Sequence, residues 1–255
     1  MRLNIHKRGT LIRLIKSGYS INSISRSLNL SKSTIYYYYK KLKGKKYKEP
    51  KFKIRFSETE GEIVGIFAGD GSQYYYRPNG QYQTSIHFGE DMEYVKYVKN
   101  MYESYFKKHW PILIEYPKLK DRQIKYRLRV TDKKVFSHFS NYIYYISQHK
   151  HDTVKLKNLH FGKNFKIGFV RGLIDTDGSI TKSYDKIHIV FYTTSKQLSK
   201  QFCNIVAEFN VKSKVYTRLP NGRNKKVLYA IRLDKSDTDK FLKVIKPFKI
   251  RRLGA

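Results

Sequence analysis

The strongest constraint on this chain is an internal repeat. The segment IVGIFAGDGS at 63–72 recurs as VRGLIDTDGS at 170–179, so the matching aspartates, Asp70 and Asp177, lie 107 residues apart. The residues after the two copies are also alike, and each half reads as a helix, two strands, a helix, two strands and a helix. Such a repeat predicts an α+β molecule with internal pseudo-twofold symmetry, as if a symmetric dimer had been fused into one chain.

The two halves are predicted over 57–152 and 153–255. After the first copy we expect strands at 73–76 and 81–88, a helix at 91–107, strands at 112–118 and 123–130, and a helix at 132–147. After the second copy we expect strands near 179–184 and 187–193, a helix at 196–209, strands at 213–219 and 226–233, and a helix at 237–245.

Residues 1–42 form a separate unit with three short helices. Gly18 is a good terminator for the first helix, and Ser20 and Ser31 are good N-caps for the second and third. Two short helices joined by a tight turn resemble a helix-turn-helix, although a plain three-helix unit is the alternative. In a helix-turn-helix the residues facing the major groove would be Lys32, Ser33, Thr34, Tyr36, Tyr37 and Lys40. Residues 43–56 read as a basic linker along phosphates.

The charge balance indicates a polyanionic partner. Lys and Arg number 53 against 20 Asp and Glu, which gives a formal net charge of +33. Nucleic acid is the usual partner of such a surplus, and an anionic membrane is the rival. We find no apolar run of about 18 residues, no signal peptide and no basic amphipathic tail. We therefore expect an intracellular protein, cytoplasmic or nucleoid-associated, that binds DNA or RNA and no membrane.

The motif copies make physical sense as two helices in close contact. Ser57 and Glu60 form a capping box that predicts the start of the first motif helix. Gly65 and Gly69 lie four residues apart on one helix face, as do Gly172 and Thr176 on the other. Small residues at this spacing let two helix backbones approach closely. The helix ends would then bring the two aspartates side by side, where cations offset their repulsion.

Both copies resemble the nine-residue signature of the LAGLIDADG homing endonucleases, in Ile63–Gly71 and Val170–Gly178, and the resemblance covers roughly 57–247. It implies two repeats whose sheets form a DNA-binding saddle, and a metal-dependent staggered double-strand break in a long DNA site. Asp70 and Asp177 would bind two or three Mg²⁺ or Mn²⁺ ions together with DNA phosphates, assisted by the backbone carbonyls of Gly69 and Thr176. One motif position departs from the family: Ala68 replaces the first aspartate, which is present as Asp175.

The family also places basic residues near the metal, often a lysine after the last strand of each half. Lys133 (or Lys134) and Lys235 are the candidates by that rule, and a solvated loop lysine is the alternative for each. Alternation of polar and apolar residues predicts one DNA-facing side for each sheet. The DNA-facing residues of the strands would be Tyr74, Tyr76, Gln81, Gln83, Ser85, His87, Lys125, Arg127, Arg129, Thr181, Ser183, Lys186, His188, Lys226 and Arg232. Arg223, Lys225 and Lys226 at the tip 220–226 would clamp phosphates.

Two other functions share these features. A non-cleaving transcription regulator would use the helix-turn-helix with an inherited saddle, and an RNA-binding intron splicing maturase would prefer RNA. Retention of both aspartates favours the endonuclease, acting as a monomer. The chain starts at Met1 directly before the first helix and lacks splicing residues at its ends, so we expect a free-standing or intron-encoded enzyme rather than part of an intein.

Overall fold

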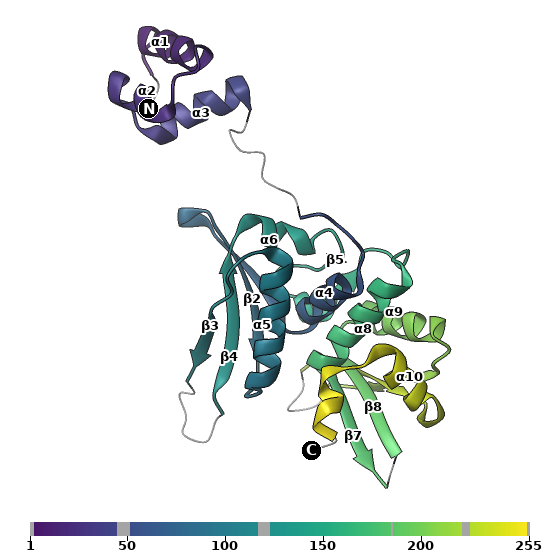
Figure 1. Cartoon of the computed structure of the whole chain (residues 1–255). Coiled ribbons are helices and arrows are strands. Elements are labelled where there is room, and N and C mark those ends of the chain that lie inside the picture. Colours follow the sequence, from purple (N-terminus) through teal and green to yellow (C-terminus); the bar gives the residue numbers. More distant parts are fainter. Residues whose placement is uncertain (1–2, 45–51, 117–122, 185, 221–224, 254–255) are drawn as a thin grey trace. The chain divides into compact units, whose positions relative to one another are not determined.

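The structure, a computed structural model, describes residues 3–44, 52–116, 123–184, 186–220 and 225–253 (Figure 1). The chain separates into two compact units, Met1–Lys51 and Phe52–Ala255. The domain boundaries predicted at 42, 56 and 152 stay predictions. Among the described residues, no helix has both the length and the apolar character that a membrane span requires.

The smaller unit contains the three predicted helices, which are α1 (Ile5–Lys16), α2 (Ile21–Leu28) and α3 (Lys32–Lys43). Ser20 and Ser31 act as N-caps, because each hydroxyl accepts a hydrogen bond from the backbone N–H three residues later, at 3.1 and 3.3 Å. Gly18 has φ +83°, which suits a glycine at the end of α1. The buried core of this unit consists of Leu11, Ile15, Ile24 and Ile35.

The larger unit contains the two repeats. In the first, α4 (Glu58–Asp70) is followed by β1 (Gly71–Tyr76), η1 (Arg77–Asn79), β2 (Gln81–Phe88), α5 (Met92–Phe106), β3 (Ile112–Glu115), β4 (Lys125–Thr131) and α6 (Lys133–Phe139). The connection contains β5 (Ile143–Tyr144), α7 (Lys150–Thr153) and β6 (Lys155–Leu156). In the second, α8 (Lys163–Asp177) is followed by β7 (Gly178–Ser183), β8 (Lys186–Thr193), α9 (Lys196–Glu208), β9 (Ser213–Arg218), β10 (Leu228–Leu233), η2 (Lys235–Asp237), α10 (Thr238–Ile245) and η3 (Phe248–Leu253).

Each repeat builds one antiparallel sheet with the same strand order, β1-β2-β4-β3 in the first and β7-β8-β10-β9 in the second. Apolar side chains such as Ile86, Leu128, Phe191 and Ile231 point from one face of each sheet into a shared core with the helices. The opposite faces carry polar side chains. The predicted α+β architecture with two matching repeats is therefore confirmed.

The helix predicted at 132–147 is wrong. α6 ends at Phe139, and Ile143 and Tyr144 instead pair with β6 in a short antiparallel ladder. Tyr142 and Ile143 are adjacent and both buried, at 0% and 2% exposure. Aromatic and β-branched residues favour extended backbone, and pairing with β6 outweighs the local helical pattern.

The two repeats pack against each other through α4 and α8, the helices that carry the repeated motif, and the backbones of these helices lie in close contact. A Cβ added at Gly65 would lie 2.3 Å from the carbonyl oxygen of Phe169, and one at Gly172 would lie 2.5 Å from that of Glu62. Gly172 is the equivalent of Gly65 in the second repeat, and Glu62 is the equivalent of Phe169 in the first. The second contact is therefore the first contact with the two helices exchanged. Gly61 and Gly168, which were not singled out from the sequence, repeat this reciprocity one turn earlier, at 2.0 and 1.8 Å. This is the geometry of an internal twofold axis.

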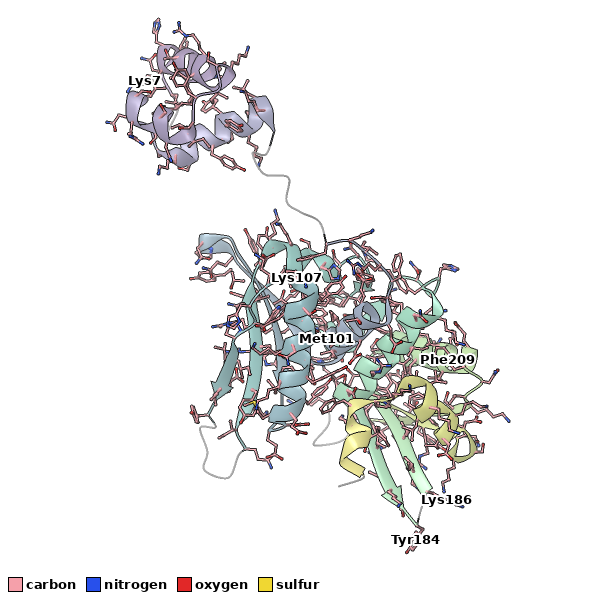
Figure 2. All side chains as sticks on the ribbon, in the orientation of Figure 1. Lys7, Met101, Lys107, Tyr184, Lys186 and Phe209 are labelled. Atoms are coloured by element: carbon pink, nitrogen blue, oxygen red, sulfur yellow. The ribbon has the colours of Figure 1, made fainter. Side chains whose placement is uncertain are left out.

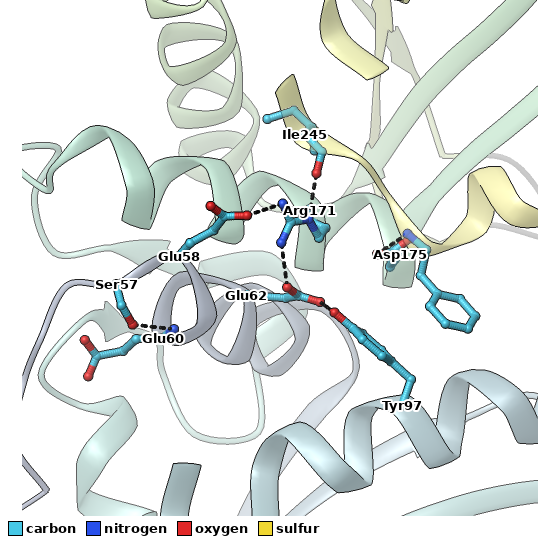
Figure 3. Close-up of polar contacts among 9 residues, drawn as sticks. Ser57, Glu58, Glu60, Glu62, Tyr97, Arg171, Asp175 and Ile245 are labelled. Carbon is cyan, nitrogen blue, oxygen red and sulfur yellow. Dashed lines mark hydrogen bonds and ion pairs between the residues drawn. The ribbon is translucent and has the colours of Figure 1, made fainter. Parts of the chain in front are cut away.

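An ion-pair network reinforces this contact from one side (Figure 3). Arg171 of α8 donates to the carboxylates of Glu62 (2.9 Å) and Glu58 of α4, and its Nε donates to the carbonyl of Ile245 (2.6 Å). Glu62 also accepts from the hydroxyl of Tyr97 (2.6 Å). Glu62 is nearly fully buried, so these partners are needed to offset its desolvation.

The segment before α4 is anchored in the larger unit. The ring of Phe52 packs edge-on against Phe106, with ring centroids 5.1 Å apart. The hydroxyl of Ser57 caps α4 as predicted by accepting from the N–H of Glu60 (3.2 Å). The Glu60 carboxylate reaches further back than a standard capping box, to the N–H groups of Arg55 (2.9 Å) and Phe56 (2.5 Å). The folded part of the larger unit therefore begins at Phe52.

Substitution of the contact glycines tests the helix packing. We expect Gly65→Ala or Gly172→Ala to lower the free energy of unfolding by at least about 1–3 kcal/mol, because the added methyl group meets backbone atoms that cannot move aside. Gly89→Ala is the matched control, since a Cβ there has no atom within 4 Å. Denaturant titrations in which the contact variants unfold like the control would show that the helices do not meet through these glycines.

Candidate metal centre and nucleic-acid interface

The two motif aspartates are the last residues of the packed helices. Asp70 ends α4 and Asp177 ends α8, and the glycine after each begins the first strand of its sheet with no intervening loop. A Cβ on Gly71 or Gly178 would lie 2.5 Å from the carbonyl oxygen four residues earlier. Glycine directly after each aspartate is therefore a steric requirement of this direct change from helix to strand.

The two half-buried carboxylates are held next to each other. The Cβ that Gly69 lacks would lie 2.8 Å from Oδ2 of Asp177, so the second carboxylate rests against the end of the first helix. Partial burial raises the pKa of Asp70 to about 7, and the charge of Asp177 raises it as well. Partial burial also raises the pKa of Asp177. Two adjacent carboxylates with little access to water favour a cation between them.

A lysine from each repeat lies against this pair. Lys150 Nζ donates to the carbonyl of Gly69 at 2.8 Å. Lys249 Nζ donates to the carbonyls of Thr176 (3.1 Å) and Gly178 (2.6 Å). Burial lowers the pKa of Lys150 to about 8, against the opposing effect of Asp177 and Asp70, and burial lowers the pKa of Lys249. The ammonium groups thus occupy matching positions, each bound to the residue before an aspartate.

The structure does not bring the predicted lysines to the aspartates. Lys133 lies over the ring of Tyr82, 5.4 Å from its centroid, toward the outer end of the β1–β2 hairpin. Lys235 begins η2 and lines a surface pocket with Lys212, Lys214 and Arg232. The lysines found at the site follow the last helix of each repeat rather than the last strand. That position was the signal in the sequence that could have identified them.

The exposed face of the first sheet gathers every residue predicted for it. Its members are Tyr74, Tyr76, Gln81, Gln83, Ser85, His87, Lys125, Arg127 and Arg129. The register places Tyr74 opposite Gln83 and His87 opposite Arg127. Ser85 is only 5% exposed, so neighbouring side chains cover it. Contact of these residues with DNA stays a prediction.

The second sheet has a comparable face. Thr181, Ser183, Lys186 and His188 pair across β7 and β8, and the guanidinium of Arg232 lies 5.4 Å from the ring centroid of Tyr216. Tyr184 and Lys186 mark the tip of the hairpin, where Tyr184 is 98% exposed (Figure 2). Lys225 is exposed, whereas Lys226 precedes β10 and donates to Asp152 (2.5 Å). Arg223 lies outside the described residues.

The third helix of the smaller unit presents the residues predicted to contact a major groove. Lys32, Ser33, Tyr36, Tyr37 and Lys40 are exposed. Thr34 is half-buried, and its hydroxyl lies 2.8 Å from that of Ser31. The rest of α3 packs through Ile35 into the core of this unit. A role for this surface in DNA binding also stays a prediction.

Comparison with known proteins agrees with this geometry. Residues 164–246 match the family model of a LAGLIDADG-like domain. The second repeat therefore carries a LAGLIDADG-like domain. An uncharacterized protein of Methanocaldococcus jannaschii is 26% identical over 176 residues, which are 67% of this chain and 59% of that protein. The chain therefore spans less than two thirds of this relative's length.

The LAGLIDADG fold is shared with solved structures. The homing endonuclease I-DmoI in complex with DNA and Mn superposes with a TM-score of 0.54 at 18% identity, covering 75% of this chain and 97% of that one. I-WcaI bound to its DNA recognition sequence gives 0.53 at 14% identity, covering 77% and 84%. The N-terminal LAGLIDADG domain of DUF199/WhiA gives 0.51 at 15% identity, covering 78% and 84%. At these identities the likeness shows the fold alone.

One buried position of the two LAGLIDADG motifs carries a carboxylate in the second copy only. The carboxylate of Asp175 accepts hydrogen bonds from the N–H groups of Phe248 (2.9 Å) and Lys249 (3.0 Å), so it fixes the start of η3 and the lysine on it. Ala68 stands at the equivalent place in the first repeat and instead lines a pocket of about 320 Å³ beside Asp177. Only the second motif therefore anchors its lysine through a carboxylate.

The donor set suits a hard, water-rich cation. Within the described ranges no group of three or more His, Cys, Asp and Glu residues could hold a metal by itself. Asp70 and Asp177 offer carboxylate oxygens, and the carbonyls of Gly69 and Thr176, predicted as further ligands, already accept from the lysines. Mg²⁺ takes one or two carboxylates and completes its shell with water and phosphate. The residues present fit such an ion when DNA supplies the phosphates.

Proposed function

We propose that this chain is a site-specific DNA endonuclease that makes a metal-dependent, staggered double-strand break in a long recognition site. The observation that carries the proposal is the pair of aspartates at the ends of α4 and α8, each with a lysine on the preceding carbonyl. One such half-site per repeat suits one cut per DNA strand. The internal twofold relation suits the two antiparallel strands of a duplex.

Asp70 and Asp177 would hold two or three Mg²⁺ or Mn²⁺ ions together with the scissile phosphates. Bound divalent cations activate water and stabilise a leaving oxygen in phosphodiester hydrolysis. The similar I-DmoI structures contain DNA with Mn, Mg or Ca, which supports the choice of a divalent ion. The chain's own part is to hold both half-buried carboxylates next to each other, where they can share a cation.

Lys150 and Lys249 would place positive charge beside the phosphates. Each ammonium is held by a backbone carbonyl, so it is already oriented before DNA arrives. A fixed cation at a phosphoryl group that gains negative charge lowers the barrier without reorganisation. The lysines also partly neutralise the aspartates while no ion is bound.

Double-stranded DNA would lie across the exposed faces of the two sheets. These faces carry lysines, arginines and amides that suit phosphates and base edges in the major groove. The net charge of +33 gives the complex strong, salt-sensitive affinity. The chain would act as a monomer in the DNA-containing compartment, cytoplasmic or nucleoid-associated, and α3 would add a second contact through a helix-turn-helix.

A non-cleaving DNA-binding regulator and an RNA-binding maturase use the same fold and charge. Neither requires two half-buried aspartates with two oriented lysines, and this combination favours cleavage. Metal-dependent nicking would separate the endonuclease from both, and preference for intron RNA over duplex DNA would separate the maturase from the regulator.

The first prediction concerns the aspartates. Asp70→Asn and Asp177→Asn should each abolish double-strand cleavage, because loss of a metal ligand costs several kcal/mol in the transition state. DNA affinity should remain close to that of the wild type, since it depends on many phosphate contacts. Plasmid linearisation and filter binding measure the two effects separately. A double variant that linearises target plasmid at the wild-type rate would refute the assignment.

The second prediction compares two pairs of lysines. Lys150→Ala or Lys249→Ala should slow cleavage about 100-fold or more by removing an oriented cation. Lys133→Ala and Lys235→Ala are matched controls that remove the same charge elsewhere, and they should cut within a few-fold of the wild type. Single-turnover rates at saturating protein isolate this difference from binding. If the Lys133 and Lys235 variants were instead the slower ones, these two lysines would be the catalytic candidates again.

The third prediction concerns the contribution of the smaller unit to DNA binding. A chain that starts at Phe52 should fold and cut, because it keeps both repeats and the packing of Phe52. Its affinity should fall, and the slope of log affinity against log salt should become shallower by about one unit for each phosphate contact removed. Its footprint should also lose a few base pairs.

Salt titration and footprinting of the two chains on one target decide this prediction. An equal slope and an equal footprint would show that residues 1–51 do not bind the cleavage site. The smaller unit would then be expected to bind an operator or a protein partner instead of the cleavage site.

A further inference from the structure

A row of polar side chains crosses the first sheet at the end nearest the aspartates. Ser72 Oγ lies 3.0 Å from His87 Nε2, His87 is directly opposite Arg127, and Arg127 Nη2 lies 3.0 Å from Glu115 Oε1. These residues come from β1, β2, β4 and β3 in the order of the sheet. Ser72 is two residues after Asp70. We call these four residues the inner row of the first sheet.

Arg127 is oriented within this row rather than free. Its side chain is 29% exposed and that of Glu115 is 37% exposed, so both reach the open face. Its Nε is buried without a hydrogen-bond partner in the described part of the chain, which leaves the ion pair to hold the guanidinium. Among the described residues of this face, Glu115 is the one acid beside basic or neutral side chains. An acid at this place weakens phosphate binding, so its presence requires another explanation.

The equivalent row of the second sheet has different chemistry. Gly71 pairs with Ile86 in the first sheet, as Gly178 pairs with Phe191 in the second. Once these two pairs are matched, the strand registers give each residue of the first sheet its counterpart in the second. The counterparts of Ser72, His87, Arg127 and Glu115 are Ser179, Tyr192, Ala230 and Arg218. An aromatic ring and a methyl group thus replace the imidazole and the guanidinium. The next arginine along, Arg129, keeps its counterpart as Arg232.

We propose that the inner row of the first sheet reads a G·C pair and that the equivalent row of the second reads an A·T pair, so the target site is asymmetric next to the cut. This inference rests on the proposed DNA recognition by the sheets. Arginine donates two hydrogen bonds to guanine O6 and N7, and glutamate accepts from cytosine N4. Arg127 and Glu115 together match both edges of one G·C pair.

The second row has no donor for guanine at the position of Arg127, because Ala230 stands there. Tyr192 and Ala230 offer apolar surface, which fits the methyl group of thymine. Arg218, at the edge strand, is left to contact phosphate. The ion pair with Arg127 also explains why an acid is tolerated on this face, because Glu115 orients the guanidinium toward a base instead of a phosphate.

Selection from a random duplex pool tests this inference, using the full chain without divalent ions so that no DNA is cut. Enriched sites should hold G·C at one inner position and A·T at the symmetry-related position. Glu115→Gln and Arg127→Ala should each reduce the preference for G·C over A·T at that position about tenfold or more. Arg129→Ala is the matched control, and it should weaken binding while leaving this preference unchanged.

The possible failures are distinct. Enriched sites with the same base pair at both related positions, or a Glu115→Gln variant that keeps the full preference, would overturn the inference and leave DNA recognition standing. A pool that shows no enrichment with the wild-type chain would overturn recognition by the sheets and this inference with it. Thermal melting of each variant confirms that a changed preference comes from the folded protein.

Discussion

The close contact between α4 and α8 determines the rest of the structure. Glycines at 61 and 65 face carbonyl oxygens of the other helix, and glycines at 168 and 172 do the same in return. Because the helices approach so closely, their ends bring Asp70 and Asp177 together. A direct change from helix to strand then starts a sheet on each side of this pair, so one contact sets both the candidate metal centre and the arrangement of the two faces.

The site gathers four ionisable groups with little access to water. Lys150 is buried and Asp70, Asp177 and Lys249 are half-buried, and this burial displaces their pKa values toward the neutral forms. Burying this many ionisable groups is unfavourable unless they are paired or bound to a metal. Divalent ions and phosphates are the partners that would satisfy all four at once. The large positive charge outside the site draws such a polyanion toward it.

The sequence predicted the parts of this molecule that depend on local rules. The repeat, the capping serines and the alternation on the strands gave the helices, the sheets and the polar faces. Local rules did not identify Lys150 and Lys249, because their approach to the aspartates depends on tertiary packing, and their place after the last helix of each repeat is the one sequence feature that they share. The helix predicted at 132–147 failed for the same reason, since pairing of Ile143 with Leu156 joins segments that no local pattern connects.

Fusion of the two halves in one chain allows them to diverge where symmetry is not required. The helix contact keeps reciprocal glycines, because a side chain on either helix would separate the aspartates. Asp175 and Ala68 have diverged, and only Lys249 is anchored through a carboxylate. Arg127 and Ala230 have diverged further out, on the faces that would meet the bases. A symmetric dimer has to read the same half-site twice, whereas this chain can keep a symmetric centre and read two different half-sites.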